Sequence, residues 1–278
     1  MISSIHLLRN SRASTPFHSI RSSKSKLSNY FSPSHSRLPR TSHLGLSRPR
    51  FFSSSDYAYE SNTAANKRVL YALMGLNIGI FGYGAYTQAQ AQAGFQEPWI
   101  KFMRNMTCNY TDVTRNGAWW TTMTSTFTHI GLGHLASNMF TLYFLGGFLC
   151  QLPIITPSRY LTIALGAGVL GSVGFLYQRY LKAGRNGIDH TRGLGFSGAL
   201  MGLTSVAACL APHTKFSIYG IIPVPLWGLC AAYGIYDGYY LNDNNSRIGH
   251  AGHLGGLVFG LAYYLLVLRG FKGRLPRL

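Results

Sequence analysis

The feature that most constrains this chain is a series of six apolar stretches after residue 68. Each is about 16 to 20 residues long, and a membrane-crossing helix needs about 20 residues, with about 17 as the lower limit. Charged residues make up only 12% of the chain, half the fraction of a typical soluble domain, which argues against a soluble helical core. The sequence therefore predicts an all-α, polytopic membrane protein, a bundle of six transmembrane helices. The predicted spans are about 69–86, 134–150, 159–177, 196–211, 217–236 and 250–268.

The distribution of basic residues bears on partners and topology. The chain has 25 Lys and Arg against 7 Asp and Glu. The Lys and Arg residues gather in the first 55 positions, at the chain end and between apolar stretches, so a nucleic-acid-binding surface is not indicated. Six spans place both basic ends on one side of the membrane, and the positive-inside tendency makes that side the cytoplasm-equivalent one. The long connections 87–133 and 178–195 then face the opposite side, and the aromatic-rich first one is expected to lie at the membrane interface.

The first 55 residues have the composition of an import signal. They hold nine Lys and Arg, seventeen Ser and no acidic residue, a pattern typical of organelle transit peptides. The stretch Arg50-Phe51-Phe52-Ser53 resembles a mitochondrial processing site, and a basic disordered tail is the alternative. We divide the chain into a transit peptide at 1–55, a short linker at 56–68, the six-span domain at 69–268 and a basic tail at 269–278.

Polar residues at the starts of three predicted spans are the strongest functional signal. His134 and Asn138 share one helix face at the start of the second span, Ser197 begins the fourth, and His253 begins the sixth. These spans run in the same direction, so their starts lie at similar depth, on the side opposite the two termini. Polar groups at that depth are costly and usually functional. The pattern predicts that the three clusters converge.

Such a set of side chains fits acyl-transfer chemistry. Ser is a weak nucleophile unless a base takes its proton, and a neutral His is the usual base. No Asp or Glu falls in the spans near Ser197 and His253, so packing is expected to orient the imidazole. The Ser197 N–H, with the side chains of His134 and Asn138, is placed to hold an oxyanion. The plainer interpretations are that Ser197 packs helices, that Asn138 joins two helices and that His134 is structural.

Small residues indicate where helices approach closely. Gly75 and Gly79, and then Gly252, Gly256 and Gly260, have the four-residue spacing that brings helix backbones together in lipid. The four cysteines form no CxxC pair, and we interpret them as small buried hydrophobes, not as disulfides or zinc ligands. The sequence predicts no metal site and no cofactor.

Together these motifs resemble the rhomboid family of intramembrane serine proteases, over about 69–268. The motifs are His134-Leu-Ala-Ser-Asn138, Gly195-Phe-Ser197-Gly198, and His253 followed by Gly256 and Gly260. The resemblance implies that Ser197 is the nucleophile and His253 the general base, and that His134, Asn138 and Ser197 form the oxyanion hole. Gly195, Gly198, Gly256 and Gly260 are expected to pack helices near this site. His129 and His250 lack the family's spacing and are expected to be loop or helix-end residues.

The run Gly-His-Ala-Gly-His-Leu-Gly-Gly at 249–256 and the transit-like N-terminus resemble the mitochondrial, presenilin-associated (PARL-like) branch. This implies a multi-pass protein of the mitochondrial inner membrane, with its active site facing the intermembrane space. The substrates would be membrane proteins whose transmembrane helix enters from the lipid bilayer. Met201 stands where bacterial rhomboids often carry a Tyr that stacks on the base. The alternatives are a non-catalytic rhomboid-like protein that binds membrane helices, and a transporter or metal site built from the histidines.

Overall fold

The computed structural model describes residues 54–184, 187–218, 221–243 and 245–270. The predicted transit peptide, apart from its last two residues, and most of the predicted basic tail lie outside the described residues. In chain order the elements are α1 (Ser54–Gln92), α2 (Gln96–Met106), β1 (Cys108–Asn109), α3 (Tyr110–Asn116), α4 (Thr121–Thr124), the 3₁₀ helix η1 (Ser125–Phe127), α5 (Leu132–Thr141), the π-helix η2 (Leu142–Gly146), α6 (Gly147–Cys150), α7 (Pro157–Ala183), β2 (Arg192–Gly193), α8 (Ser197–Leu210), β3 (Lys215–Ile218), β4 (Ile222–Pro225), α9 (Leu226–Tyr239), α10 (His250–Tyr263) and the π-helix η3 (Tyr264–Leu268).

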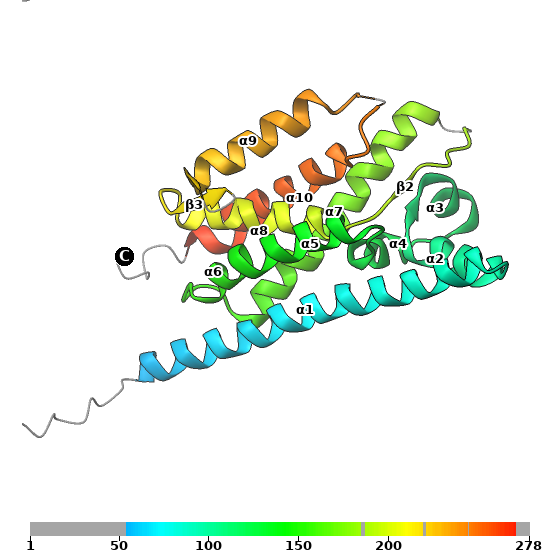
Figure 1. The fold of residues 1–278 in the computed structure, drawn as a ribbon. Coiled ribbons are helices and arrows are strands. Elements are labelled where there is room, and N and C mark those ends of the chain that lie inside the picture. Colours follow the sequence, from blue (N-terminus) through cyan, green and yellow to red (C-terminus); the bar gives the residue numbers. More distant parts are fainter. Residues whose placement is uncertain (1–53, 185–186, 219–220, 244, 271–278) are drawn as a thin grey trace, which may run out of the picture. The chain divides into compact units, whose positions relative to one another are not determined.

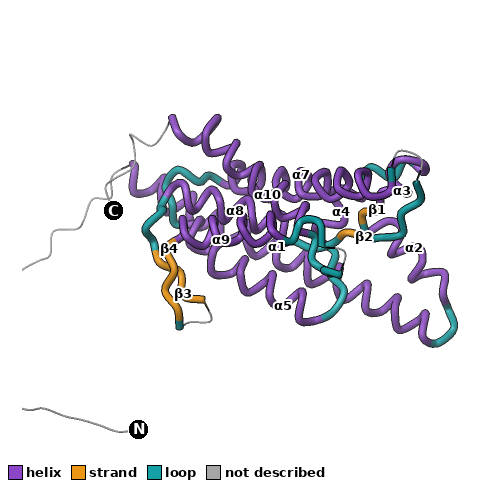
Figure 2. The backbone as a smooth tube through the Cα atoms, turned by 90° about the horizontal axis from the view of Figure 1, so that it is seen from above, coloured by secondary structure: helices purple, strands orange, loops and turns teal. Residues whose placement is uncertain are grey.

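Helices dominate the described part of the chain, which confirms the predicted class of fold (Figure 2). Within the described residues, three helical segments are long and apolar enough to cross a membrane: Tyr59–Gln92, Pro157–Ala183 and His250–Leu268. They match the first, third and sixth predicted spans. At the second span, α5, η2 and α6 follow one another without a break, and at the fourth span α8 is an apolar helix of 14 residues. The count of six crossings stays a prediction.

The fifth predicted span is wrong in its first half. β3 pairs with β4 in an antiparallel arrangement, with 215–218 opposite 222–225, and α9 begins only at Leu226. Pro223 and Pro225 have no backbone N–H to donate within a helix, and a Pro restricts the residue before it to extended backbone. The shift moves the end of the fifth helix to Tyr239, beyond the predicted limit of 236.

The predicted linker at 56–68 is also helical, because α1 starts at Ser54 and continues through the first predicted span. Residues 57–68 contain neither Gly nor Pro, so nothing in this segment interrupts a helix. The buried Asn66 side chain donates to the backbone carbonyl of Ile155, at 2.7 Å, and to that of Cys150. This contact ties the start of α1 to the connection between α6 and α7.

The long connection at 87–133 folds into short elements. β1 pairs with β2, with Cys108 opposite Gly193, and the Arg192 guanidinium contacts the Asp112 carboxylate at 2.7 Å. These contacts join the connection to the segment that leads into α8. Asp189 in that segment is buried, which by itself raises the pKa of its carboxyl, but hydrogen bonds from Arg179 and Thr191 outweigh this and lower the pKa.

Glycines bring α7, α8 and α10 together, and these helices lie between α1 and α9 (Figure 1). A Cβ added to Gly256 would lie 1.9 Å from the Gly198 carbonyl oxygen, and one on Gly260 would lie 2.3 Å from the Gly202 oxygen. Gly198 itself has more room, since a Cβ added there would lie 3.4 Å from its nearest neighbour, the Gly252 carbonyl oxygen. The close approach predicted from the glycine spacing in α10 is therefore confirmed.

The same spacing misleads in α1. At Gly75 and Gly79 an added Cβ would meet no heavy atom of the described residues within 4 Å. Both glycines lie on an exposed part of the helix. The four-residue spacing permits close packing, but whether a second helix lies against that face depends on the rest of the fold.

Candidate active site

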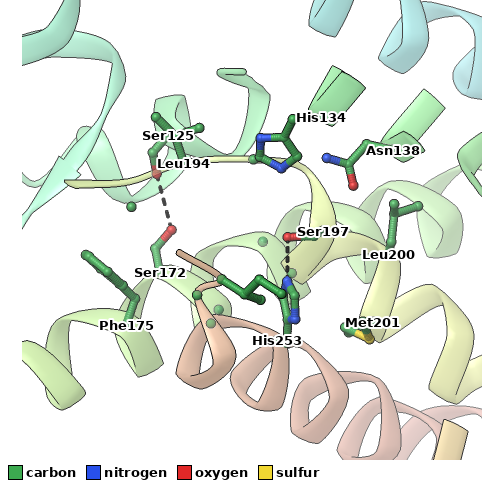
Figure 3. Close-up of a pocket in the computed structure, with 18 of the residues that line it drawn as sticks. Ser125, His134, Asn138, Ser172, Phe175, Leu194, Ser197, Leu200, Met201 and His253 are labelled. Atoms are coloured by element: carbon green, nitrogen blue, oxygen red, sulfur yellow. Dashed lines mark hydrogen bonds between the residues drawn. The ribbon is translucent and has the colours of Figure 1, made fainter. Parts of the chain in front are cut away.

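Ser197 and His253 meet at the starts of two helices. Ser197 is the first residue of α8 and His253 the fourth of α10. The Ser197 Oγ lies 2.8 Å from the His253 Nε2, within hydrogen-bond distance (Figure 3). Because Gly256 lets the two helix backbones touch, the two side chains reach each other although 56 residues separate them.

Gly195 shapes the turn that leads into α8. Its φ is +120°, a region that residues with a side chain rarely adopt, and a Cβ there would lie 2.8 Å from the His134 ring. Its N–H donates to the Ser125 carbonyl oxygen at 2.9 Å. The absent side chain lets the imidazole of His134 pack against the backbone just before Ser197.

His134 and Asn138 both belong to α5 and line the same pocket as Ser197. In Figure 3 they lie on one side of Ser197, and His253 lies on the other. The cavity that these four residues share has a volume of about 480 Å³. The structure thus brings the three predicted clusters together in one pocket.

His129 supports this arrangement, a contribution that the sequence analysis did not anticipate. It lies in the loop before α5, as expected, but it is buried. Its Nε2 accepts from the Asn138 amide at 2.8 Å and from the Phe196 N–H at 3.3 Å. An amide NH₂ carries two donors, so the second N–H of Asn138 stays free of this bond. His129 therefore fixes Asn138 and the residue before Ser197 at the same time.

Acid is expected to weaken the fold through His129. Burial, together with the charge of His134, lowers the pKa of His129 to about 4. A His in the unfolded chain has a pKa of about 6.5. The unfolded state therefore binds an extra proton between these two values, and stability is lost as the pH falls through this window. The midpoint temperature of thermal unfolding in detergent should decrease as the pH is lowered from 7 to 5.

The matched variant for this prediction is His129→Gln, which keeps an acceptor and a donor but does not titrate. Its midpoint temperature of unfolding should decrease less than that of the wild type over the same pH interval. Equal losses in the two proteins would show that the protonation of His129 is not linked to folding.

The prediction that packing alone orients the His253 imidazole is wrong. The His253 Nδ1 lies 3.1 Å and 3.2 Å from the two carboxylate oxygens of Asp237. Asp237 is the twelfth residue of α9, one position beyond the predicted fifth span, and was missed for that reason. The available signal was that it is one of only seven acidic residues in the chain.

His250 is the first residue of α10, at a helix end as expected, and it shares Asp237 with His253. Its Nδ1 lies 2.6 Å from the Asp237 Oδ1, and its Nε2 lies 2.8 Å from the Ser246 Oγ. The side chains of His250 and Asp237 are both almost completely buried. A buried carboxylate needs such partners, because an unpaired one is strongly destabilising.

The part of the chain that carries this pocket's predicted site residues is similar to known proteins. Residues 116–270, more than half of the chain, match the family model described as "Rhomboid domain". The chain belongs to the rhomboid family. This rhomboid domain contains all of the predicted site residues together with Asp237.

Three relatives illustrate the similarity. "RHOMBOID-like protein 12, mitochondrial" of Arabidopsis thaliana is 30% identical, over 61% of this chain and 53% of its own length. "Rhomboid protein 1, mitochondrial" of Saccharomyces cerevisiae is 27% identical, over 71% and 52%. "Rhomboid protease GluP" of Bacillus subtilis is 29% identical, over 52% and 25%. The chain spans about half the length of the Arabidopsis and yeast relatives.

Proposed function

We propose that this rhomboid-family chain is an intramembrane serine protease that hydrolyses peptide bonds in or near transmembrane segments. The observation that carries the proposal is the 2.8 Å contact between Ser197 and His253. It lies in a pocket at the starts of two apolar helices. A hydroxyl within hydrogen-bond reach of an imidazole is the arrangement that nucleophilic catalysis requires.

The proposed reaction proceeds through an acyl-enzyme. The Ser197 Oγ forms a bond to the scissile carbonyl carbon while its proton passes to the His253 Nε2. When the C–N bond breaks, His253 returns that proton to the leaving amine. Water then attacks the acyl-enzyme, gives a proton to His253, and releases the new carboxyl group and the regenerated Ser197 hydroxyl.

The oxyanion of each tetrahedral intermediate needs fixed hydrogen-bond donors. As the first residue of α8, Ser197 has a backbone N–H without a partner inside the helix. The His134 ring and the second N–H of Asn138 are the other donors that we propose, since both side chains line the pocket. Donors that are already in place need no reorganisation during the reaction.

Asn138→Ala is expected to weaken catalysis without abolishing it. One of three proposed donors is lost, and one donor is typically worth about 10²- to 10³-fold in rate. The measurement is the rate constant with which a fluorophosphonate labels the detergent-solubilised protein, compared with that of Ser217→Ala, an exposed position on β3. Complete loss of labelling in a folded variant would contradict shared stabilisation of the oxyanion.

The alternative is a rhomboid-like protein that binds membrane helices without cutting them. It is disfavoured because the nucleophile and the base are both present and in contact. A fluorophosphonate separates the two functions, since it should label Ser197 in the wild type and nothing in Ser197→Ala. Absence of labelling in folded wild-type protein would favour the binding protein, and loss of activity with a chelator would favour a metal-dependent one.

We further propose that the chain works in the mitochondrial inner membrane, with the pocket facing the intermembrane space. The Arabidopsis and yeast relatives are both named as mitochondrial, and the first 55 residues have the composition of an import signal. The substrates would be membrane proteins that present a transmembrane helix. A reporter fused to residues 1–60 should reach mitochondria, and its delivery elsewhere would refute this location.

A further inference from the structure

We propose that Asp237 is a positioning residue for His253, held in place by His250, so that the Ser197–His253 pair works as part of a longer hydrogen-bonded chain. This inference rests on the proposed protease function. It starts from the contacts of one carboxylate that lies between two imidazoles. The Asp237 oxygens lie 3.1 Å and 3.2 Å from the Nδ1 of His253, and the Oδ1 lies 2.6 Å from the Nδ1 of His250.

The chemistry of these groups fixes the proton on His253. An ionised carboxylate only accepts hydrogen bonds, so the Nδ1 of His253 must carry the hydrogen. In a neutral imidazole the Nε2 is then an acceptor, and the only hydrogen left for its contact with Ser197 is that of the hydroxyl. The Ser197 O–H therefore points at the nitrogen that is to remove its proton. The opposite tautomer would aim an N–H at Ser197 and leave it without a base.

A second group of contacts holds the carboxylate. His250 donates from its Nδ1 to Asp237, its Nε2 contacts the Ser246 hydroxyl at 2.8 Å, and the Ile248 N–H donates to that same hydroxyl oxygen at 3.1 Å. The rings of Tyr236 and Tyr240 lie with centroids 5.7 Å and 5.9 Å from that of His250. These contacts restrict where the Asp237 carboxylate can move.

The position of Asp237 in the fold suits this role. The nucleophile is on α8, the base on α10 and the carboxylate on α9, so three successive helices of 14 residues each supply one group. Asp237 is only 2% exposed, on a helix whose other residues carry no charge. A negative charge beside the imidazole also stabilises the imidazolium that forms when Ser197 loses its proton. Asp237 thus orients the neutral imidazole of His253 before the reaction and stabilises the imidazolium that forms during it.

The decisive variant is Asp237→Asn, which keeps the shape of the side chain and removes its charge. Its amide can donate to the Nδ1 of His253 and so favour the unproductive tautomer. The probe is a fluorophosphonate–rhodamine, and the two quantities measured are kinact and KI. We expect kinact to fall by up to about 10⁴-fold, the effect of the same change in a Ser-His-Asp triad, with KI within about threefold of wild type. Asp237→Glu, which keeps the charge, should recover part of kinact.

The matched control is Asp243→Asn, which removes the same charge six residues further along. Asp243 is exposed, and its Oδ1 accepts from the Asn245 N–H at 2.8 Å, away from both imidazoles. Its kinact should equal that of the wild type. If Asp237→Asn keeps a kinact within about threefold of this control, Asp237 does not position the base and the inference is overturned.

A measurement on the wild type decides the question even if Asp237→Asn does not fold. The ¹⁵N chemical shifts of the His253 ring, assigned by comparison with His253→Ala, report which nitrogen carries the proton. The inference requires the proton on Nδ1, and a proton on Nε2 in the neutral ring would overturn it. Failure of the protease function looks different, because then the wild type is not labelled at all, whatever the tautomer of His253.

Discussion

Ser197→Ala and His253→Ala are each expected to lower proteolytic turnover by about 10⁴- to 10⁶-fold, because nucleophile and base act as one unit. Without the hydroxyl no acyl-enzyme forms, and without the imidazole the hydroxyl keeps its proton. The double variant should be about as inactive as either single one, since the second removal takes away a function that is already lost. The two single variants should still fold and insert into the membrane, since each change removes a few atoms from the wall of an existing cavity.

The measurement for this prediction needs a natural substrate. Comparing the N-termini of membrane proteins from cells with the wild type and with Ser197→Ala identifies candidates, and turnover is then measured in detergent with purified protein. Two controls lie on exposed parts of the chain: Ser217→Ala on β3 and His213→Ala in the turn before it. Full proteolysis by purified Ser197→Ala would show that the proposed mechanism is wrong.

Gly256→Ala is expected to prevent α8 and α10 from packing, at a cost of about 3 kcal/mol or more in the free energy of unfolding. An added Cβ would lie 1.9 Å from the Gly198 carbonyl oxygen. That atom is part of the helix backbone and cannot move aside as a flexible side chain would. Because His253 lies one turn before Gly256, separating the helices would also break its contact with Ser197. The variant should therefore lose both its thermal stability and its fluorophosphonate labelling.

Gly79→Ala is the matched control, since it makes the same chemical change in the middle of a helix. Its added Cβ would meet no heavy atom of the described residues within 4 Å, so the unfolding midpoint should equal or exceed that of the wild type. Equal stability of the Gly256→Ala and Gly79→Ala proteins in detergent would contradict the close contact between α8 and α10.

The outcome for the spans shows where sequence patterns are reliable. Hydropathy was sufficient to predict the helices at the first, third and sixth spans, because a long apolar segment without Pro satisfies its backbone in lipid as a helix. The fifth span failed because Pro223 and Pro225 lie within an apolar stretch, and composition alone cannot distinguish an apolar hairpin from a helix. That error displaced the helix end and kept Asp237 out of consideration.

The sequence by itself determined the class of fold and the residues that define the pocket. Apolar length specifies helices, and the motifs around His134, Ser197 and His253 stand at the starts of three helices. Only the tertiary structure decided which polar groups pair with each other. The approach of α9 to α10 places Asp237 between two imidazoles, and the fold of the loop before α5 places His129 against Asn138. Such pairings depend on distances between segments remote in the chain, and no local pattern encodes these distances.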